Sequence, residues 1–303
     1  MPQTQPTSSR FTLRLLLALW AFVALFAHPD TALSAPSVSL AALPATMIAA
    51  DDATLACKTA GHGPPLLLLT GYACSMDGWD ADLVGALAAE HTVIACDYRG
   101  VGESTSGAAP FTLRRFADDA AAALTSLGVG KADVLGWSMG AATAVEMALA
   151  HPDRVDKAVL IGAPFSSDVV ASAVDRMAAM SRREFRESLF PPSWVTAHPD
   201  AYDRLPRTVP PVSAATIARQ REALVTWSGF AGRVGACRTP IFLVVGDADW
   251  VTPPSESEAL AKLLPRGCLI RIKDAGHWLP YQDPAVLTRM VNHVLDAPRP
   301  CVP

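Results

Sequence analysis

The stretch Gly136-Trp137-Ser138-Met139-Gly140 decides the predicted fold, because it places a serine between a strand and a helix. A β-rich run over 131–135 precedes it, and an alanine-rich helical run over 141–150 follows it. A serine at such a turn, with glycine two residues before and two residues after, is typical of a nucleophile elbow. The turn is sharp, and glycine has no Cβ to collide with the neighbouring backbone. We therefore expect the Ser138 hydroxyl to project from the top of a sheet.

Short apolar runs alternate with helical patterns along most of the chain. Continuously apolar strands of this kind indicate a parallel sheet that is covered on both faces. The fold class predicted is therefore α/β, with a doubly wound, mostly parallel sheet. The expected strands are 55–59, 66–70, 92–95, 133–135, 158–161, 241–245 and 269–272. The expected helices are 79–90, 113–127, 141–150, 255–264 and 285–295.

The interval 165–236 breaks this alternation, because it holds helix-like pieces around a proline-rich stretch and no convincing strand. It is too long for a simple connection, so we interpret it as a helical cap inserted into the domain. Its aromatic side chains either line a pocket from above or pack the cap onto the core; they are Phe185, Phe190, Trp194, Trp227 and Phe230. The predicted organisation is a signal peptide over 1–35, a first core part over 36–164, the cap over 165–236 and a second core part over 237–303.

Composition excludes some classes of function. The chain has 303 residues, 50% of them hydrophobic, which is enough for one large core. The net charge of −4 comes without a basic stripe, so we expect no binding of nucleic acid. Cysteines and histidines do not cluster at metal-ligand spacing. We therefore expect no metal and no organic cofactor.

The N-terminus has the pattern of an export signal. Arg10 and Arg14 precede an uncharged apolar stretch over 15–27, and Ala32-Leu33-Ser34-Ala35 offers a cleavage region. The apolar stretch is shorter than the about 20 residues that a spanning helix needs. We expect a cleaved signal and a periplasmic or secreted protein without stable membrane insertion. The alternative is an uncleaved signal that anchors the protein at the membrane.

Six cysteines follow this segment, and an even number in an exported chain permits disulfides. Cys237 and Cys268 each stand just before an expected strand. If the two strands are parallel neighbours, both cysteines lie at the same end of the sheet and can form a disulfide. The alternative is that they are small buried or free residues. Cys96 lies within an apolar strand and is predicted to be a core residue.

A serine hydroxyl is a poor nucleophile at neutral pH, so it needs a base and a carboxylate that orients the base. Asp247 and Asp249 follow one expected strand, and His277 follows the next. The carboxyl ends of these strands share the sheet edge at which Ser138 is expected. The chain order is serine, aspartate, histidine, as in the triads of strand-turn-helix elbows.

With these residues the chain resembles the α/β-hydrolase fold family over about 55–295. The segment Asp97-Tyr98-Arg99-Gly100-Val101-Gly102-Glu103-Ser104 is similar to the family's Asp-x-Arg-Gly-x-Gly-x-Ser pattern. The resemblance implies a triad of Ser138, Asp249 and His277. It selects Asp249 over Asp247, which is the alternative if the turn is shifted.

The resemblance also implies two backbone donors for a transition-state oxyanion. One is the N–H of Met139, directly after the candidate nucleophile, and the other is the N–H of Tyr72. The family often has histidine where this chain has Thr70, which should change the support of the loop more than the backbone hydrogen bond. Four tryptophans near these segments are candidate pocket residues: Trp137, Trp194, Trp250 and Trp278.

The function expected is that of an exported serine hydrolase that cleaves carboxylic esters through an acyl-enzyme, acting on a small-molecule ester or lactone. Dehalogenases and epoxide hydrolases of this fold are expected to use aspartate at the elbow, so Ser138 argues against both. The alternatives are a lactonase, a carbon–carbon bond hydrolase or a perhydrolase of the same fold. An alternative from another class is a non-catalytic exported binding protein.

Overall fold

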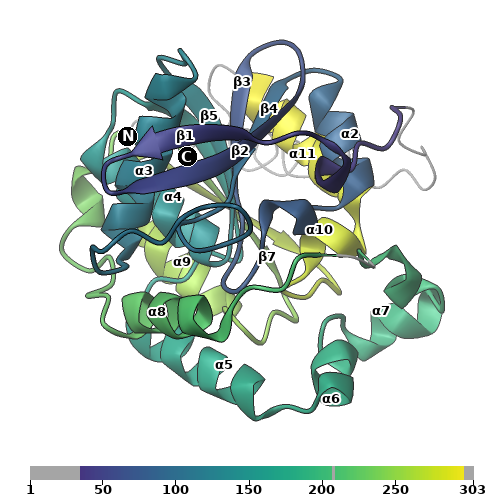
Figure 1. Cartoon of the computed structure of the whole chain (residues 1–303). Helices are drawn as coiled ribbons and strands as arrows, with labels where there is room; N and C mark the ends of the chain where they lie inside the picture. The colour runs from purple at the N-terminus through teal and green to yellow at the C-terminus, as the bar shows by residue number, and fades with distance from the viewer. Residues whose placement is uncertain (1–34, 207–208, 297–303) are drawn as a thin grey trace, which may run out of the picture.

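The computed structural model describes residues 35–206 and 209–296. An eight-stranded, mostly parallel sheet forms the centre of the fold (Figure 1). The predicted signal peptide lies outside the described residues, apart from Ala35. The strand order is β1-β2-β4-β3-β5-β6-β7-β8; β2 pairs antiparallel with β1 and β4, and the other pairs are parallel. The strands are β1 Thr46–Ala50, β2 Ala53–Gly61, β3 Pro65–Leu69, β4 Thr92–Cys96, β5 Ala132–Trp137, β6 Val155–Ile161, β7 Ile241–Gly246 and β8 Gly267–Ile272. The predicted fold class is confirmed.

Strand β1 is absent from the sequence-based prediction. It pairs with β2 along its whole length, from Thr46 opposite Cys57 to Ala50 opposite Ala53. Alanine is depleted in strands, and two of the five residues of β1 are alanine. The antiparallel pairing with β2 therefore determines this strand more than its own composition does.

Helices cover both faces of the sheet, as Figure 1 shows. Leu67 and Leu69 of β3 pack on one face in the same cluster as helices α3, α4 and α9. Leu66 and Leu68 point to the other face, where they share a cluster with α2 and α11. Successive side chains of a strand point to opposite faces, so a continuously apolar strand serves both clusters. These helices are α2 Ala81–Ala88, α3 Leu113–Ser126, α4 Met139–Ala150, α9 Pro254–Leu263 and α11 Pro284–Asp296.

Four α-helices and two short 3-10 helices, and no strand among the described residues, connect β6 to β7. They run along the lower edge of the molecule in Figure 1. We call residues 165–236 the inserted segment. Its helices are α5 Ser167–Ala179, α6 Arg182–Glu187, α7 Pro192–Ala197 and α8 Ala214–Val225.

A buried carboxylate joins the end of the inserted segment to the helical layer. Glu146 of α4 accepts hydrogen bonds from both terminal nitrogens of Arg233, at 2.7 and 2.6 Å, and from the indole N–H of Trp227 at 3.1 Å. Trp227 packs edge-on against Phe230, with ring centroids 4.5 Å apart. Both aromatic rings therefore belong to the core rather than to a pocket.

The segment 97–104 also has a structural role. Arg99 is fully buried, and its guanidinium binds Asp119 of α3 through two hydrogen bonds of 2.7 Å and Asp52 through one of 2.9 Å. Two-point binding of a carboxylate fixes the geometry of a guanidinium as well as its charge. This contact therefore ties the loop after β4 to α3 and to the β1–β2 turn.

The structure revises two predictions about cysteines. Cys96 is a buried core residue, as predicted, but it also forms a disulfide with Cys57, which faces it across the β2–β4 pair. The predicted bond between Cys237 and Cys268 does not form, and Cys237 is a free, buried thiol. Strands β7 and β8 are parallel neighbours, but their register sets Cys268 opposite Phe242. Cys237 lies five positions before Phe242, too far along the chain to reach Cys268.

Replacing both bonded cysteines, Cys57→Ala with Cys96→Ala, should lower the free energy of unfolding by roughly 2–4 kcal/mol, because the bond closes a long loop of the unfolded chain. The separation is 39 residues. Urea denaturation of oxidised protein measures the change, and non-reducing peptide mapping should recover the linked pair. Adding a reductant should destabilise the wild type more than the double variant, because the variant keeps the disulfide that Cys268 forms. Equal stabilities of the two proteins under oxidising conditions would contradict this role.

Candidate active site

Ser138 occupies a strained turn between β5 and α4, with φ 58° and ψ −118°. Its N–H donates to the carbonyl of Ile161 at 2.9 Å, which fixes the turn against β6. A Cβ on Gly140 would lie 2.0 Å from the carbonyl oxygen of Leu69, and a Cβ on Gly136 would lie 2.6 Å from that of Gly140. Both glycines of the motif are therefore required by close backbone contact.

His277 and Asp249 form a buried pair. The Nδ1 atom of His277 lies 2.8 Å from Oδ2 of Asp249, and the two side chains are 3% and 1% exposed. The other carboxylate oxygen of Asp249 accepts the backbone N–H groups of Val251 at 2.9 Å and Thr252 at 2.8 Å. The aspartate is thus held from the turn after β7 and oriented toward the histidine that follows β8.

The two competing aspartates lie elsewhere. Asp247 and Asp274 are both exposed, and the carboxylate of Asp247 accepts the backbone N–H of Asp274 at 2.9 Å. Neither carboxylate contacts His277. The geometry therefore agrees with the choice of Asp249.

Thr252 is a site residue that the sequence did not predict. Its hydroxyl oxygen lies 3.0 Å from the carbonyl of Gly162, 3.0 Å from Oδ2 of Asp249 and 3.1 Å from Nδ1 of His277. Gly162 has a φ of 55°, and a Cβ there would come within 2.9 Å of the His277 ring. The hydroxyl three residues after the candidate acid was the available signal, because such residues often bond locally to aspartate turns.

The four candidate tryptophans separate into two pairs. Trp137 donates its indole N–H to the carbonyl of His277 at 2.8 Å, and Trp137 and Trp278 line the cavity beside the histidine. Trp194 instead stacks on His198, and the indole N–H of Trp250 donates to a backbone carbonyl of the inserted segment at 3.0 Å. Trp194 and Trp250 therefore pack the inserted segment and do not line this cavity.

The loop after β3 runs directly beside Ser138. A Cβ on Gly71 would lie 3.4 Å from Cβ of Ser138. Helix α8 holds the next residues, because Ala73 donates its N–H to the Gln220 side chain at 2.9 Å and the Tyr72 hydroxyl donates to a carbonyl of the same helix. Among the described residues, the N–H groups of Tyr72 and Met139 have no acceptor. Both predicted donors are thus free to bind an oxygen near Ser138.

Asp97 anchors the far side of the same loop. Its carboxylate accepts the N–H of Met76 at 2.7 Å and the hydroxyl of Ser75 at 3.3 Å. Burial raises the pKa of Asp97 to about 6, against the opposing effect of these hydrogen bonds. The neighbouring ion pair of Lys58 and Asp77 spans 2.7 Å. The first residue of the Asp-x-Arg-Gly pattern therefore supports the loop that carries Tyr72.

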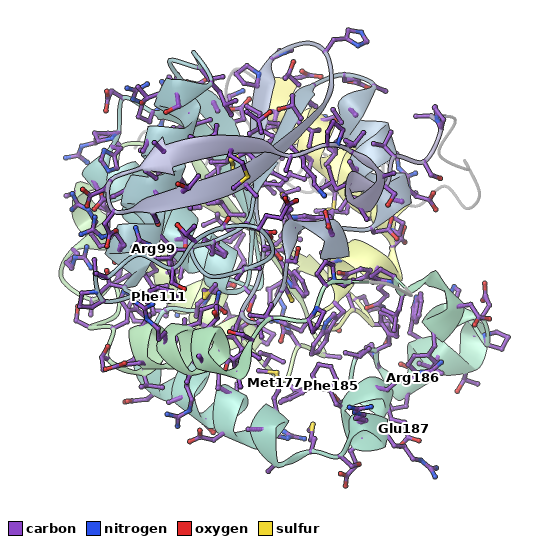
Figure 2. All side chains as sticks on the ribbon, viewed as in Figure 1. Arg99, Phe111, Met177, Phe185, Arg186 and Glu187 are labelled. Atoms are coloured by element: carbon purple, nitrogen blue, oxygen red, sulfur yellow. A yellow bond between two sulfur atoms is a disulfide. The ribbon has the colours of Figure 1, made fainter. Side chains whose placement is uncertain are left out.

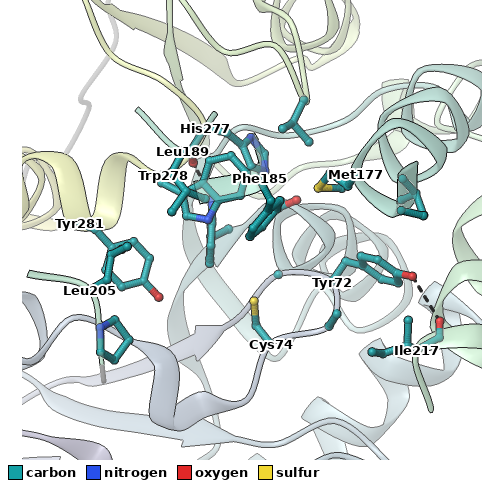
Figure 3. A pocket seen from close by; sticks show the side chains of 18 residues that line it. Tyr72, Cys74, Met177, Phe185, Leu189, Leu205, Ile217, His277, Trp278 and Tyr281 are labelled. Atoms are coloured by element: carbon teal, nitrogen blue, oxygen red, sulfur yellow. Dashed lines mark hydrogen bonds between the residues drawn. The ribbon is translucent and has the colours of Figure 1, made fainter. Parts of the chain in front are cut away.

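A cavity of about 500 Å³ opens beside Ser138 and His277 (Figure 3). The core contributes aromatic rings to its wall, and the inserted segment contributes Met177 and Phe185. Figure 2 shows these two side chains on the sheet-facing side of α5 and α6. Among the residues that the structure describes, no aspartate, glutamate, lysine or arginine lines the cavity. Of the predicted cap aromatics, Phe185 alone belongs to this wall.

The described residues include no group of three or more histidines, cysteines, aspartates or glutamates that could hold a metal ion. Within the same part of the chain, no helix is long and apolar enough to span a bilayer.

The sequence matches the family model of the alpha/beta hydrolase fold over residues 64–192 and 184–284. The chain belongs to the α/β-hydrolase family. The matched region includes the elbow, the segment 97–104 and the turns that carry Asp249 and His277. The resemblance drawn from these motifs is thereby confirmed.

Relatives of this α/β hydrolase carry the names of hydrolases. RutD of Pseudomonas savastanoi, named as a candidate carbamate hydrolase, is 27% identical over 249 residues, which is 77% of this chain and 94% of RutD. A pimeloyl-acyl-carrier-protein methyl ester esterase of Neisseria meningitidis is 28% identical over 248 residues, 76% of this chain and 78% of the esterase. The solved structure of a thermophilic esterase from Thermogutta terrifontis, with malate bound, is 25% identical with a TM-score of 0.71, and the match covers 83% of this chain and 97% of that one.

The buried Asp97 should make the protein less stable as the pH rises from about 4 to about 6. A carboxyl whose pKa is raised in the folded state stabilises that state while protonated, and the stability is lost when it ionises. Asp97→Asn should remove a share of this decline on the order of 3 kcal/mol, because asparagine does not ionise. Its amide oxygen can still accept the N–H of Met76, and its NH2 group can donate to the hydroxyl oxygen of Ser75. Urea denaturation across this pH range measures the slope.

Burial likewise raises the pKa of Asp133 to about 6. The loss of stability that comes from Asp133 should therefore remain in the Asp97→Asn variant. An unchanged slope in folded Asp97→Asn would contradict the assignment to Asp97.

Proposed function

We propose that this α/β hydrolase cleaves carboxylic esters through a Ser138-His277-Asp249 triad and an acyl-enzyme. The observation that carries the proposal is the buried hydrogen bond between His277 and Asp249 at the wall of a cavity that Ser138 also lines. Ser138 and His277 have no direct hydrogen bond to each other in this structure. Such bonds are often long before substrate binds and tighten in the reacting complex.

The first step forms a bond between Oγ of Ser138 and the carbonyl carbon of the ester. The serine proton passes to Nε2 of His277, while Asp249 stabilises the imidazolium at Nδ1. The N–H groups of Tyr72 and Met139 bind the oxyanion, and one such donor is typically worth about 2.7–4 kcal/mol of the barrier. His277 then protonates the leaving alkoxide, and the C–O bond to the alcohol breaks.

The second step hydrolyses the acyl-enzyme. Water gives a proton to His277 and attacks the acyl carbon, and the returning proton restores the Ser138 hydroxyl as the carboxylic acid leaves. Thr252 supports both steps as a positioning residue, because its hydroxyl lies within hydrogen-bond distance of both Asp249 and His277.

The names of two relatives support ester cleavage. Two of the proteins described above are esterases by name, and one of these acts on a methyl ester. The serine at the elbow supports acyl transfer, since the dehalogenases and epoxide hydrolases of this fold are expected to use aspartate there.

We extend the proposal to the location of the protein and to its inserted segment. Export is supported by the signal pattern of the sequence and by the Cys57–Cys96 disulfide, since such bonds persist in oxidising compartments. A covering role for the inserted segment is supported by Met177 and Phe185, which it contributes to the cavity wall.

Ser138→Ala should reduce kcat on an activated ester such as p-nitrophenyl acetate by roughly four to six orders of magnitude, with the fold intact. Ser104→Ala is the matched control. Ser104 accepts the N–H of Ala56 and donates to the carbonyl of Asp97, both at 2.9 Å, so its loss should lower stability and not kcat. Near-normal turnover by folded Ser138→Ala would refute the proposed nucleophile.

Asp249→Asn should lower kcat by about 10³–10⁴-fold, because an amide cannot stabilise the imidazolium and favours the wrong tautomer of the histidine. Asp247→Asn changes the same functional group two residues away on an exposed side chain and should keep kcat within about twofold. Steady-state kinetics of the two purified variants measures the ranking. A larger loss in Asp247→Asn would move the acid to that position.

A further inference from the structure

Two cavities of very different size meet at Ser138. The larger one, of about 500 Å³, is also lined by His277. The smaller one has about 20 Å³ of space for the centres of water-sized groups, and its wall includes Met139 and Thr252 but not the histidine. Tyr72 borders both cavities. A carbonyl carbon bound to Ser138 would therefore have a large space on one side and a small one on the other.

The position of His277 decides which half of an ester enters each space. The leaving oxygen must receive its proton from His277, so the alkoxy group must lie in the cavity that the histidine lines. The acyl substituent diverges from the leaving oxygen around the tetrahedral carbon. The small cavity is a second space that borders Ser138, and apolar side chains such as Val170 and Leu224 line it, so it receives that substituent.

The small cavity has room for about one methyl group. A space of about 10–15 Å³, counted in the same way as the 20 Å³ of this cavity, holds a single water molecule. Its walls are well packed. Val170 of α5, Leu224 of α8 and Thr252 are 6%, 1% and 2% exposed. A longer acyl chain would have to displace these buried side chains, which densely packed interiors resist.

The large cavity favours an apolar alcohol. Its two tyrosine hydroxyls are already engaged, since Tyr72 donates to the carbonyl of Ile217 and Tyr281 donates to the carbonyl of Gly78. Figure 3 shows both rings at the cavity wall, with the Cys74 thiol between them. Burial raises the pKa of Cys74 to about 11, so this thiol is neutral at physiological pH. The described part of the wall offers no aspartate, glutamate, lysine or arginine to bind an ammonium ion or a carboxylate.

We propose that the preferred substrates are acetyl esters, or esters of comparably short acyl groups, of medium-sized apolar alcohols. The inference rests on the proposed serine esterase activity and specifies the substrate class of that same site. It also disfavours lactones, because the acyl and alkoxy carbons of a lactone belong to one ring and cannot diverge into separate cavities.

Hexyl acetate and methyl heptanoate provide a matched test, because they are isomers that exchange the long and short halves of the ester. The kcat/KM of the wild-type protein should be at least about tenfold higher for hexyl acetate, since one methylene in a fitted apolar pocket changes rates by about 10–200-fold. Titration of released acid measures both rates, and dependence of each rate on Ser138 is checked with Ser138→Ala.

An equal or higher rate for methyl heptanoate, or no cleavage of hexyl acetate, would overturn the inference. Either result leaves the proposed function standing if cleavage of another ester depends on Ser138. Hydrolysis of hexyl acetate that persists unchanged in Ser138→Ala would instead refute the proposed function.

Leu224→Ala enlarges the small cavity and tests its role directly. The ratio of kcat/KM for hexyl butyrate to that for hexyl acetate should rise about tenfold in this variant. Leu260→Ala is the matched control, because Leu260 of α9 is equally buried and lines neither cavity. It should leave the ratio unchanged. An unchanged ratio in folded Leu224→Ala would contradict the assignment of the acyl group to this cavity.

Discussion

The left-handed backbone of Ser138 is the constraint on which the rest of the site depends. A non-glycine residue in such a conformation costs about 1–3 kcal/mol and persists only where its surroundings over-determine it. Here α4 begins immediately after the serine, and Gly140 brings the first turn of that helix against the carbonyl of Leu69 in β3. The same close packing brings Gly71 against Ser138. One strained residue therefore sets both the position of the hydroxyl and the place of the loop that carries Tyr72.

Parallel strand order assembles the other parts of the site at the same edge. Strands β5, β6, β7 and β8 are consecutive neighbours, and the turns after them supply Ser138, Gly162, Asp249 and His277 in that order. Gly162 has no side chain, and this leaves room for His277 Nδ1 to reach the carboxylate. The described residues of the inserted segment add no aspartate, glutamate, lysine or arginine to the cavity wall. The core thus supplies the polar groups of the site, and the inserted segment supplies apolar surface that shapes the cavities.

Short sequence motifs predicted those features of the site that depend on neighbouring residues in the chain. The glycine spacing around Ser138 predicted the elbow. The turns after two apolar strands predicted an aspartate–histidine pair, and the resemblance to the family selected Asp249 and His277 for it. The missed features depend on register between strands that are distant in sequence. Cys57 meets Cys96 only because β2 lies antiparallel beside β4, and Cys237 misses its predicted partner because β8 is displaced along β7. The contacts of the inserted segment could not be predicted either. Its tryptophans pack against residues that are distant in sequence and come near only in the folded chain.

Covalent labelling is the sharpest test of whether Ser138 is an activated nucleophile. The purified protein is treated with a fluorophosphonate, whose phosphorus accepts attack by an activated serine, and the modified peptide is mapped by mass spectrometry. We expect a single modification at Ser138 that is abolished in folded His277→Ala. A folded wild-type protein that stays unlabelled, or a label on a different serine, would refute the role of Ser138.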